Sequence, residues 1–204
     1  MTITKKIVKL LGLGFFLLLV GCGAPPRPDH VENICSIFQE YPDWYWDAKH
    51  TQNKWGISIP VQMAIIYQES SFNAKARPPR HKLLWVIPWK RPSSAYGYSQ
   101  ALKNTWKEYE RSNGVSATRS AFDDASDFIG WYSAQACHKL GIAPNNAYAL
   151  YLAYHEGLGG YAHHSYLRKP WLIKVSHRVS NRAQIYHNQL MRCEASIPKK
   201  HWWN

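Results

Sequence analysis

Acidic residues are scarce in this chain of 204 residues, which has 13 Asp and Glu against 25 Lys and Arg and a formal net charge of +12. Three of the positive charges are lysines near the N-terminus, which leaves +9 (12 − 3) for the remainder. So basic a chain favours an anionic partner, such as a wall polymer, lipid head groups or nucleic acid, although a basic surface can also serve solubility alone. No RNA- or DNA-binding motif is present, so we expect no nucleic-acid partner.

Three further absences narrow the fold class and the chemistry. No segment alternates strongly between apolar and polar residues with a period of two, and no internal repeat is present. No C-x-x-C pair occurs, and the 10 histidines show no ligand spacing beside the cysteines. We therefore expect a mainly α fold with no metal site and no cofactor.

Apolar residues recur instead with helical spacing, between recognisable start and stop signals. Asp29, with Glu32 three residues later, is expected to cap a first helix that ends at Pro42. Ser58 is expected to cap a third helix, with Pro60 tolerated in its first turn. Residues 76–94 and 157–160 are expected to be irregular. The other expected helices are Asp43–Trp55, about Ala101 to Arg111, Ala125–Leu140, Pro144–His155 and Trp171–Arg192.

The N-terminal segment has the features of an export signal. Lysines precede an apolar run from Leu10 to Val20, which is too short and too unevenly flanked for a membrane-spanning helix. The run ends in LVGC, which resembles a bacterial lipobox and implies that Cys22 is lipidated; a plain secretory signal with a chance cysteine is the alternative. We expect a signal peptide over residues 1–21, a Pro-rich tether over 22–28 and one domain over 29–204.

Export has consequences for location and partners. Gly23 follows the cysteine, whereas the lipoproteins that this segment resembles carry Asp there when they stay in the inner membrane. We therefore expect the chain to be held at the periplasmic face of the outer membrane by its N-terminal lipid. Export also argues against a nucleic-acid partner.

Three cysteines remain once Cys22 is assigned to lipid, so an oxidising compartment predicts one disulfide and one free thiol. Cys35 and Cys193 lie near the two ends of the domain, and closing that loop would stabilise the fold by ~4–5 kcal/mol in the chain-entropy model. We predict a Cys35–Cys193 bond and a free Cys137.

Glu69 is the first candidate for chemistry. It ends an apolar helix, one turn beyond Ile65 and Ile66. Desolvation there, together with the negative end of the helix dipole, would raise its pKa and keep a carboxylic acid protonated near neutral pH. Glycosidic bond cleavage needs such an acid. A helix-end glutamate paired with an arginine is an equal interpretation of this segment.

Three short motifs then carry a resemblance to a known family. Residues 67–73 (YQESSFN), 97–100 (GYSQ) and 153–157 (AYHEG) resemble, in order, the E-S-x-F-N, G-L-M-Q and A-Y-N-A-G motifs of family 1 lytic transglycosylases. The resemblance spans roughly Trp55 to Leu190 and implies a goose-lysozyme-like, mainly α fold. It also implies peptidoglycan strands as the substrate.

The resemblance implies a specific reaction. One glutamate, here Glu69, protonates the glycosidic oxygen between N-acetylmuramic acid and N-acetylglucosamine, and then acts as base toward the muramoyl 6-hydroxyl. The product is a 1,6-anhydromuramoyl end, and no second catalytic carboxylate is required. The sequence agrees, because the segment from Glu69 to Gln100 contains no other acidic residue.

Supporting roles follow from the same resemblance. Ser70 would hydrogen-bond Glu69, Gln100 would contact an acetamido group, and Tyr154 would pack against sugar with its hydroxyl toward the acid. Core packing is an equal interpretation of Tyr154. Tyr186 would approach the acid from the last helix, although it also belongs to that helix's apolar stripe.

The departures from the family motifs leave alternatives open. Tyr98 and His155 replace the family's Leu and Asn and are included among the predicted substrate contacts. Glu156 replaces an Ala and adds a carboxylate that could hold a water, so a hydrolytic muramidase is the nearest alternative. A non-catalytic peptidoglycan-binding lipoprotein and a membrane-surface scaffold are the others. Trp85 and Trp89, in the long basic loop before the second motif, would either line the cleft or pack on the domain.

Overall fold

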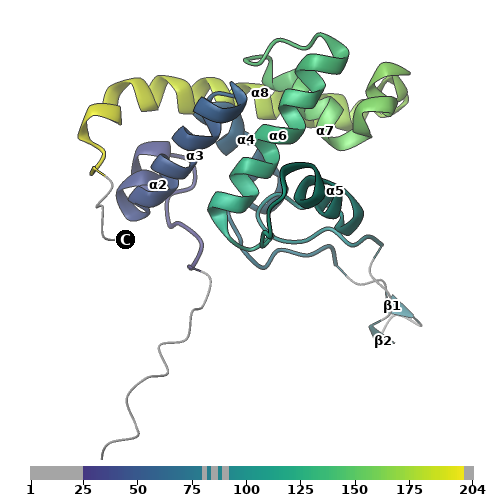
Figure 1. Cartoon of the computed structure of the whole chain (residues 1–204), viewed down its shortest axis with the longest axis horizontal. Helices are drawn as coiled ribbons and strands as arrows, with labels where there is room; N and C mark the ends of the chain where they lie inside the picture. The colour runs from purple at the N-terminus through teal and green to yellow at the C-terminus, as the bar shows by residue number, and fades with distance from the viewer. Residues whose placement is uncertain (1–24, 80–81, 84–86, 89–91, 200–204) are drawn as a thin grey trace, which may run out of the picture.

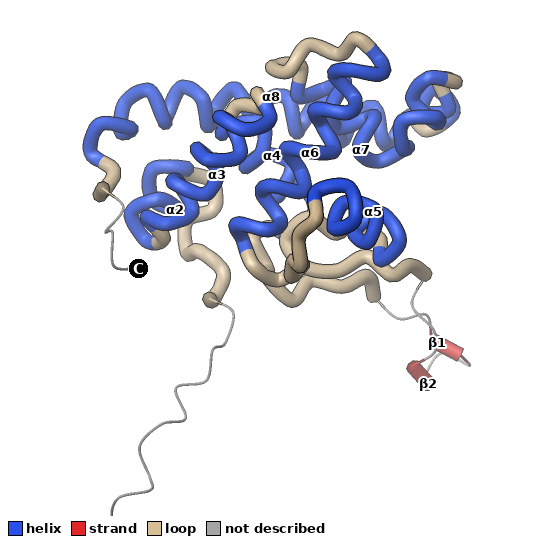
Figure 2. Tube along the Cα trace, viewed as in Figure 1, coloured by secondary structure: helices blue, strands red, loops and turns tan. Residues whose placement is uncertain are grey.

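A computed structural model describes residues 25–79, 82–83, 87–88 and 92–199, and this part of the chain is mainly helical, as expected (Figures 1 and 2). The expected signal peptide, Cys22, Trp85 and Trp89 lie outside the described residues. Within them, no helix combines the length and apolar composition that crossing a bilayer requires. The elements in chain order are α2 (Ile34–Glu40), α3 (Pro42–Trp55), α4 (Ile59–Ser70), β1 (Lys82–Leu83), β2 (Ile87–Pro88), α5 (Lys103–Asn113), α6 (Phe122–Leu140), α7 (Ala147–Ala162), the 3-10 turn η1 (Ser165–Arg168), α8 (Pro170–Cys193) and the 3-10 turn η2 (Glu194–Ser196).

Helix α4 lies at the centre of the molecule. Its residues from Ile59 to Ile66 are all buried, and a helix without a polar face is stable only when other elements cover it on every side. Helices α3, α6 and α8 provide that cover. The helix begins after Ser58 with Pro60 in its first turn, as predicted, but the Ser58 side chain makes no capping hydrogen bond. It ends where Ser71 adopts a left-handed conformation. The apolar run therefore positions its last turn, and Glu69 with it.

A buried amide ties α4 to two of its neighbours. Gln62 is fully buried, and its Nε2 donates to the carbonyls of Ala48 and Ile57 at 3.1 and 2.6 Å. Its Oε1 accepts from the hydroxyl of Ser126 on α6 at 2.8 Å. Because a buried amide without partners is costly, this satisfied set favours one arrangement of α3, α4 and α6.

Three predicted helix starts were wrong; one of them is that of α6, which begins at Phe122 rather than at Ala125. Helix α2 begins at Ile34 rather than after Asp29, because the Asn33 side chain accepts from the backbone N–H groups of Cys35 and Ser36. The backbone N–H of Asp29 instead donates to Glu40. Similarly, Asn146 caps α7, so this helix begins at Ala147 rather than at Pro144.

Helix α7 also continues past its predicted end. It was expected to stop at His155, but helical structure resumes beyond Gly157 and runs to Ala162. Gly157 itself has φ 78° and ψ 159°, a conformation that other residues rarely adopt, so the helix is kinked there. Residues 76–94 were expected to be irregular; their described part contains the antiparallel pair β1 and β2.

The predicted disulfide is present. Cys35 on α2 is bonded to Cys193 at the end of α8, and Cys137 is a free thiol. Figure 1 shows the C-terminal end of α8 returning to the side of the molecule that holds α2. The bond thus joins the first and last described helices.

Candidate active site

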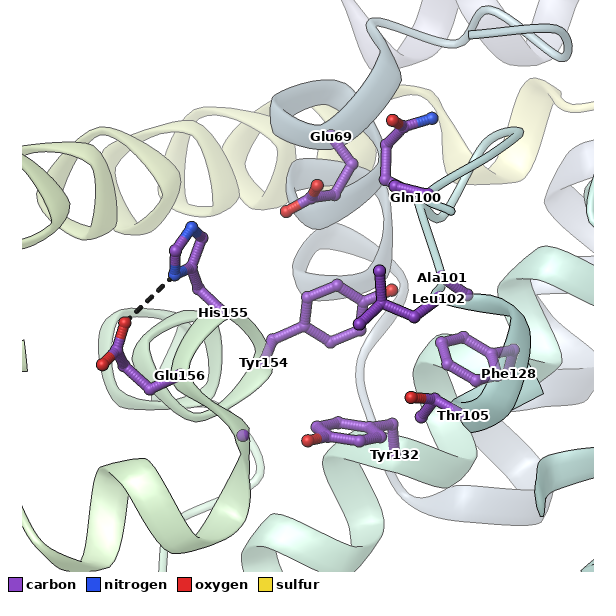
Figure 3. A pocket seen from close by; sticks show the side chains of 12 residues that line it. Glu69, Gln100, Ala101, Leu102, Thr105, Phe128, Tyr132, Tyr154, His155 and Glu156 are labelled. Carbon is purple, nitrogen blue, oxygen red and sulfur yellow. Dashed lines mark hydrogen bonds and ion pairs between the residues drawn. The ribbon is translucent and has the colours of Figure 1, made fainter. Parts of the chain in front are cut away.

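A pocket of about 440 Å³ opens beside Glu69 (Figure 3). Three segments that are distant in the sequence meet there: the end of α4, the turn before α5 and the middle of α7, with α6 closing one side. These segments carry the three motifs of the sequence analysis. The residues that line the pocket are Glu69, Ala95, Gln100, Ala101, Leu102, Thr105, Phe128, Tyr132, Tyr154, His155, Glu156 and Gly157.

Glu69 has the properties of a proton donor near neutral pH. Burial raises the pKa of its carboxyl to about 7, and a hydrogen bond with Tyr151 opposes part of that rise. Within the described residues, no lysine or arginine forms an ion pair with Glu69. The alternative of a helix-end glutamate paired with an arginine is therefore not what the structure shows.

Tyr151 is the contact of Glu69 that the sequence analysis missed. It lies on α7, its side chain is buried, and its hydroxyl is hydrogen-bonded to the Glu69 carboxyl. It precedes Tyr154 and His155 by three and four residues, so the three share one face of the helix. That spacing was the available signal, but Tyr151 lies outside the A-Y-N-A-G pattern.

The second motif forms a tight turn that presents Gln100 to the pocket. Gly97 has φ 78°, and a Cβ there would lie 1.9 Å from the carbonyl oxygen of Arg119, so only glycine fits. Gln100 donates through Nε2 to the carbonyls of Ala76 and Gly97 at 3.0 and 2.8 Å. Its Oε1 lies on the side of Glu69 in Figure 3. The turn thus holds the amide with its acceptor toward the pocket.

The same turn sends Tyr98 in the opposite direction, which corrects a prediction. Tyr98 is fully buried and packs edge-on against Trp44 and Phe122, so it is a core residue rather than a substrate contact. Among the described residues, its hydroxyl has no hydrogen-bond partner. Positive φ angles at Gly97 and Gln100 bend the main chain here, so Gln100 faces the pocket while Tyr98 enters the core.

Two other predicted neighbours of Glu69 are also corrected. The Ser70 hydroxyl donates to the main-chain carbonyl of Ile66 at 3.2 Å, the usual local partner of a serine inside a helix, rather than to Glu69. Tyr186 is fully buried, and its hydroxyl donates to the carbonyl of Val31. The apolar stripe of α8, and not the acid, determines where Tyr186 points.

Tyr154 lines the pocket as predicted, but its hydroxyl is directed elsewhere. It donates to the carbonyl of Ser99 at 2.6 Å, which joins α7 to the second motif. Its ring packs edge-on against Phe128 and Tyr132 of α6. Burial and the nearby charge of Glu69 both raise its pKa well above the ordinary value, so it stays a neutral donor.

Glu156 lies at the pocket margin but is fully engaged by protein groups. Its side chain is 4% exposed, and it accepts from Lys169 at 2.7 Å, from His155 at 3.2 Å and from the hydroxyl of Ser165. Burial by itself would raise its pKa, but these hydrogen bonds outweigh burial and lower the pKa to about 2. Glu156 is therefore an ionised anchor for the segment beyond the kink.

The remaining predicted residue, His155, does line the pocket. Its ring packs edge-on against Trp171, whose side chain is largely exposed. Within the described part of the chain, no group of three or more His, Cys, Asp or Glu side chains is placed to hold a metal ion.

A comparison with known proteins agrees with the fold. A family model described as "Transglycosylase SLT domain" matches residues 10–193, which is most of the chain. A search of curated proteins gave no match. The match includes all three motif segments around the pocket, and the mainly helical architecture is that of a lysozyme-like SLT domain.

Proposed function

The chain belongs to the transglycosylase SLT domain family, and from that membership we propose that it cleaves peptidoglycan as a lytic transglycosylase. The bond broken is the β-1,4 linkage between N-acetylmuramic acid and N-acetylglucosamine. The observation that carries this proposal is Glu69, a carboxyl with a pKa of about 7 at the head of a pocket. An acid with that pKa can both give and take a proton near neutral pH.

The reaction needs no other catalytic group. The Glu69 carboxyl gives its proton to the glycosidic oxygen as the bond from C1 of the muramoyl sugar breaks. The 6-hydroxyl of the same sugar then attacks C1, and its proton returns to the Glu69 carboxylate. The enzyme regains its starting state, and the product is a 1,6-anhydromuramoyl end. The hydrogen bond from Tyr151 supports the carboxylate that exists between the two steps.

The state of Glu156 favours this route over hydrolysis. Glu69 and Glu156 are the two carboxylates that line the pocket, and an inverting hydrolase would use the second to activate water. Glu156 has a pKa of about 2 and accepts hydrogen bonds from three protein donors, so it is a poor base for activating water. A muramidase that uses Glu156 is thus the weaker candidate.

The other pocket residues are proposed to position the sugar. The Oε1 of Gln100 is available to accept from an acetamido N–H, since its Nε2 is already used by the chain. The Tyr154 ring and the half-exposed Leu102 offer apolar surface to a sugar ring. His155 offers a ring nitrogen to a sugar hydroxyl.

Product analysis tests this proposal. Purified peptidoglycan is digested with the soluble domain, and the released fragments are identified by mass. We expect 1,6-anhydro ends from the unaltered protein and, from Glu69→Gln, a loss of at least the ~10²–10⁴-fold typical of general acid catalysis. Glu108→Gln, an exposed glutamate outside the pocket lining, is the control. Reducing ends would indicate a hydrolase, and no release a binding protein.

We further propose that the chain is an exported lipoprotein anchored in the outer membrane through Cys22. Support comes from the N-terminal lysines, the apolar run and the LVGC segment. Cells that express the chain would be labelled with palmitate and fractionated. Label in the outer membrane that is lost in Cys22→Ser supports the proposal, whereas unlabelled protein in the soluble periplasm contradicts it.

A further inference from the structure

The carboxyl of Glu156 is hydrogen-bonded to the ring of its neighbour His155 at the margin of the pocket (Figure 3). The family motif that residues 153–157 resemble has Ala at this position, so the carboxylate is a feature of this chain and not of the motif. Its side chain is 4% exposed and also accepts from Lys169 and Ser165. Those two contacts anchor the segment beyond the kink in α7, whereas the contact with His155 does not.

The contact with Glu156 determines which nitrogen of the His155 ring carries a proton. Glu156 has a pKa of about 2, so its carboxylate is ionised at neutral pH and only accepts hydrogen bonds. The Nδ1 of His155, 3.2 Å from that carboxylate, must therefore be the donor. The Lys169 ammonium already balances the Glu156 charge, so the imidazole is not needed as a second cation. A neutral imidazole with its proton on Nδ1 accepts through Nε2 and cannot donate there.

The packing of the His155 ring leaves Nε2 accessible from the pocket. The ring lies edge-on to Trp171, with the centroids 5.1 Å apart, and its centroid is 6.5 Å from that of Tyr151. In Figure 3 the ring nitrogen that is not bonded to Glu156 points away from that residue. The side chain of His155 is 34% exposed, and it lines the pocket together with Glu69. A group bound in the pocket can therefore reach this nitrogen.

We propose that Glu156 is a positioning residue, which fixes His155 as a hydrogen-bond acceptor for a hydroxyl of the sugar bound at Glu69. The inference rests on the proposed function, because only then does a sugar lie there. An asparagine, the motif's residue in place of His155, carries an amide that can turn either its donor or its acceptor toward a ligand. Held by Glu156, His155 offers an acceptor alone. The pocket of this chain therefore favours a hydroxyl over a carbonyl oxygen at this position.

Nitrogen NMR of the histidine-labelled protein near neutral pH tests the position of the proton. The chemical shifts of the two ring nitrogens distinguish a proton on Nδ1, on Nε2 or on both. We expect His155, identified by the signals lost in His155→Ala, to carry its proton on Nδ1. In Glu156→Gln the amide can either accept from Nδ1 or donate to it, so the proton should be shared between the two nitrogens. Ser165→Ala is the control, because it removes a different donor from the same carboxylate and should leave the proton on Nδ1.

Kinetics of the same variants test whether Nε2 acts on the substrate. Glu156→Gln should raise KM for glycan strands by about two- to tenfold, the worth of a hydrogen bond between neutral groups, and change kcat less. In a His155→Ala background, Glu156→Gln should have no further effect on KM, because Glu156 acts through the His155 ring. Ser165→Ala should keep the KM of the unaltered protein.

A proton on Nε2, or on both nitrogens of His155, in the unaltered protein would overturn the inference. So would an unchanged KM in Glu156→Gln, or an equal rise with and without His155, which would indicate a structural role. Products without 1,6-anhydro ends would contradict the proposed reaction instead. The proton position does not depend on turnover, and the affinity of Glu69→Gln for glycan strands, with and without Glu156→Gln, would then take the place of KM.

Discussion

The pKa of Glu69 links the function of one residue to the stability of the whole chain. Its carboxyl has an ordinary pKa of 4.5 and a pKa of about 7 in the folded protein. Below pH 4.5 it is protonated in both folded and unfolded states, so it contributes no penalty. As the pH rises through 7 the folded protein must ionise a buried group, and the stability that the neutral acid allowed is lost.

A first prediction follows from this linkage. Glu69→Gln should be as stable as the unaltered protein near pH 4.5 and more stable by about 1–3 kcal/mol above pH 7, because the amide never ionises. Urea unfolding at several pH values measures the difference. Turnover of the unaltered protein should fall over the same range as the acid loses its proton. A stability difference that is constant with pH would show that folding does not raise the pKa of Glu69.

Tyr151 provides a second prediction at this scale. Its hydrogen bond lowers the pKa of Glu69, so Tyr151→Phe should move the loss of activity at high pH to a higher pH. Turnover should also fall by about tenfold, because a hydrogen bond to the carboxylate is worth roughly 1.5–3 kcal/mol. Tyr148→Phe, one turn earlier on α7 and outside the pocket lining, is the control. A lower rate without any shift of the pH profile would indicate a packing role alone.

The conformation of the turn at residues 97–100 depends on the absence of a side chain at Gly97. A Cβ at Gly97 would meet main-chain atoms of Arg119, which cannot move aside as a flexible side chain can. Gly141, the C-cap of α6, has a similar φ of 67° but open space around it. Substitutions at these two glycines therefore distinguish the cost of a steric clash from the cost of backbone strain.

The third prediction compares these two positions. Gly141→Ala should cost about 1–2 kcal/mol, the strain of a left-handed residue. Gly97→Ala should cost at least about 3 kcal/mol and also displace Gln100 and thereby lower activity. Thermal unfolding and turnover of both variants test this. Equal costs at the two positions would show that the turn can shift away from Arg119.

At the scale of the whole molecule, the Cys35–Cys193 bond closes a loop with a sequence separation of 158 residues. The fourth prediction is that replacing both cysteines by serine lowers the free energy of unfolding by ~4–5 kcal/mol in the chain-entropy model. Cys137→Ser should change it by less than about 1 kcal/mol. Denaturant unfolding measures both. If the double variant loses no stability, the ends of the chain are held by other contacts, such as the Tyr45 hydrogen bond to Glu194.

The sequence by itself determined the helical content, the centre of the fold and the identity of the candidate acid. The reason is that these properties are local: an apolar run between Ser58 and Glu69 must be buried, and periodicity with capping residues marks most helix limits. The cysteine pairing could be predicted because few pairings were possible. Where a start was wrong, as at Asp29, a second capping residue nearby competed for the same role.

Only the tertiary structure decided which side chains face Glu69. The hydroxyls of Tyr154 and Tyr186 donate to main-chain carbonyls of segments that are far away in the sequence. The hydroxyl of Tyr98 has no hydrogen-bond partner among the described residues. Tyr151 reaches the acid because α7 packs on α6 and α8, which also pack on α4. Glu156 is paired with Lys169, which lies beyond the kink in α7. A motif records which residue types occur together, whereas the direction of each side chain depends on how the packed helices satisfy their buried polar groups.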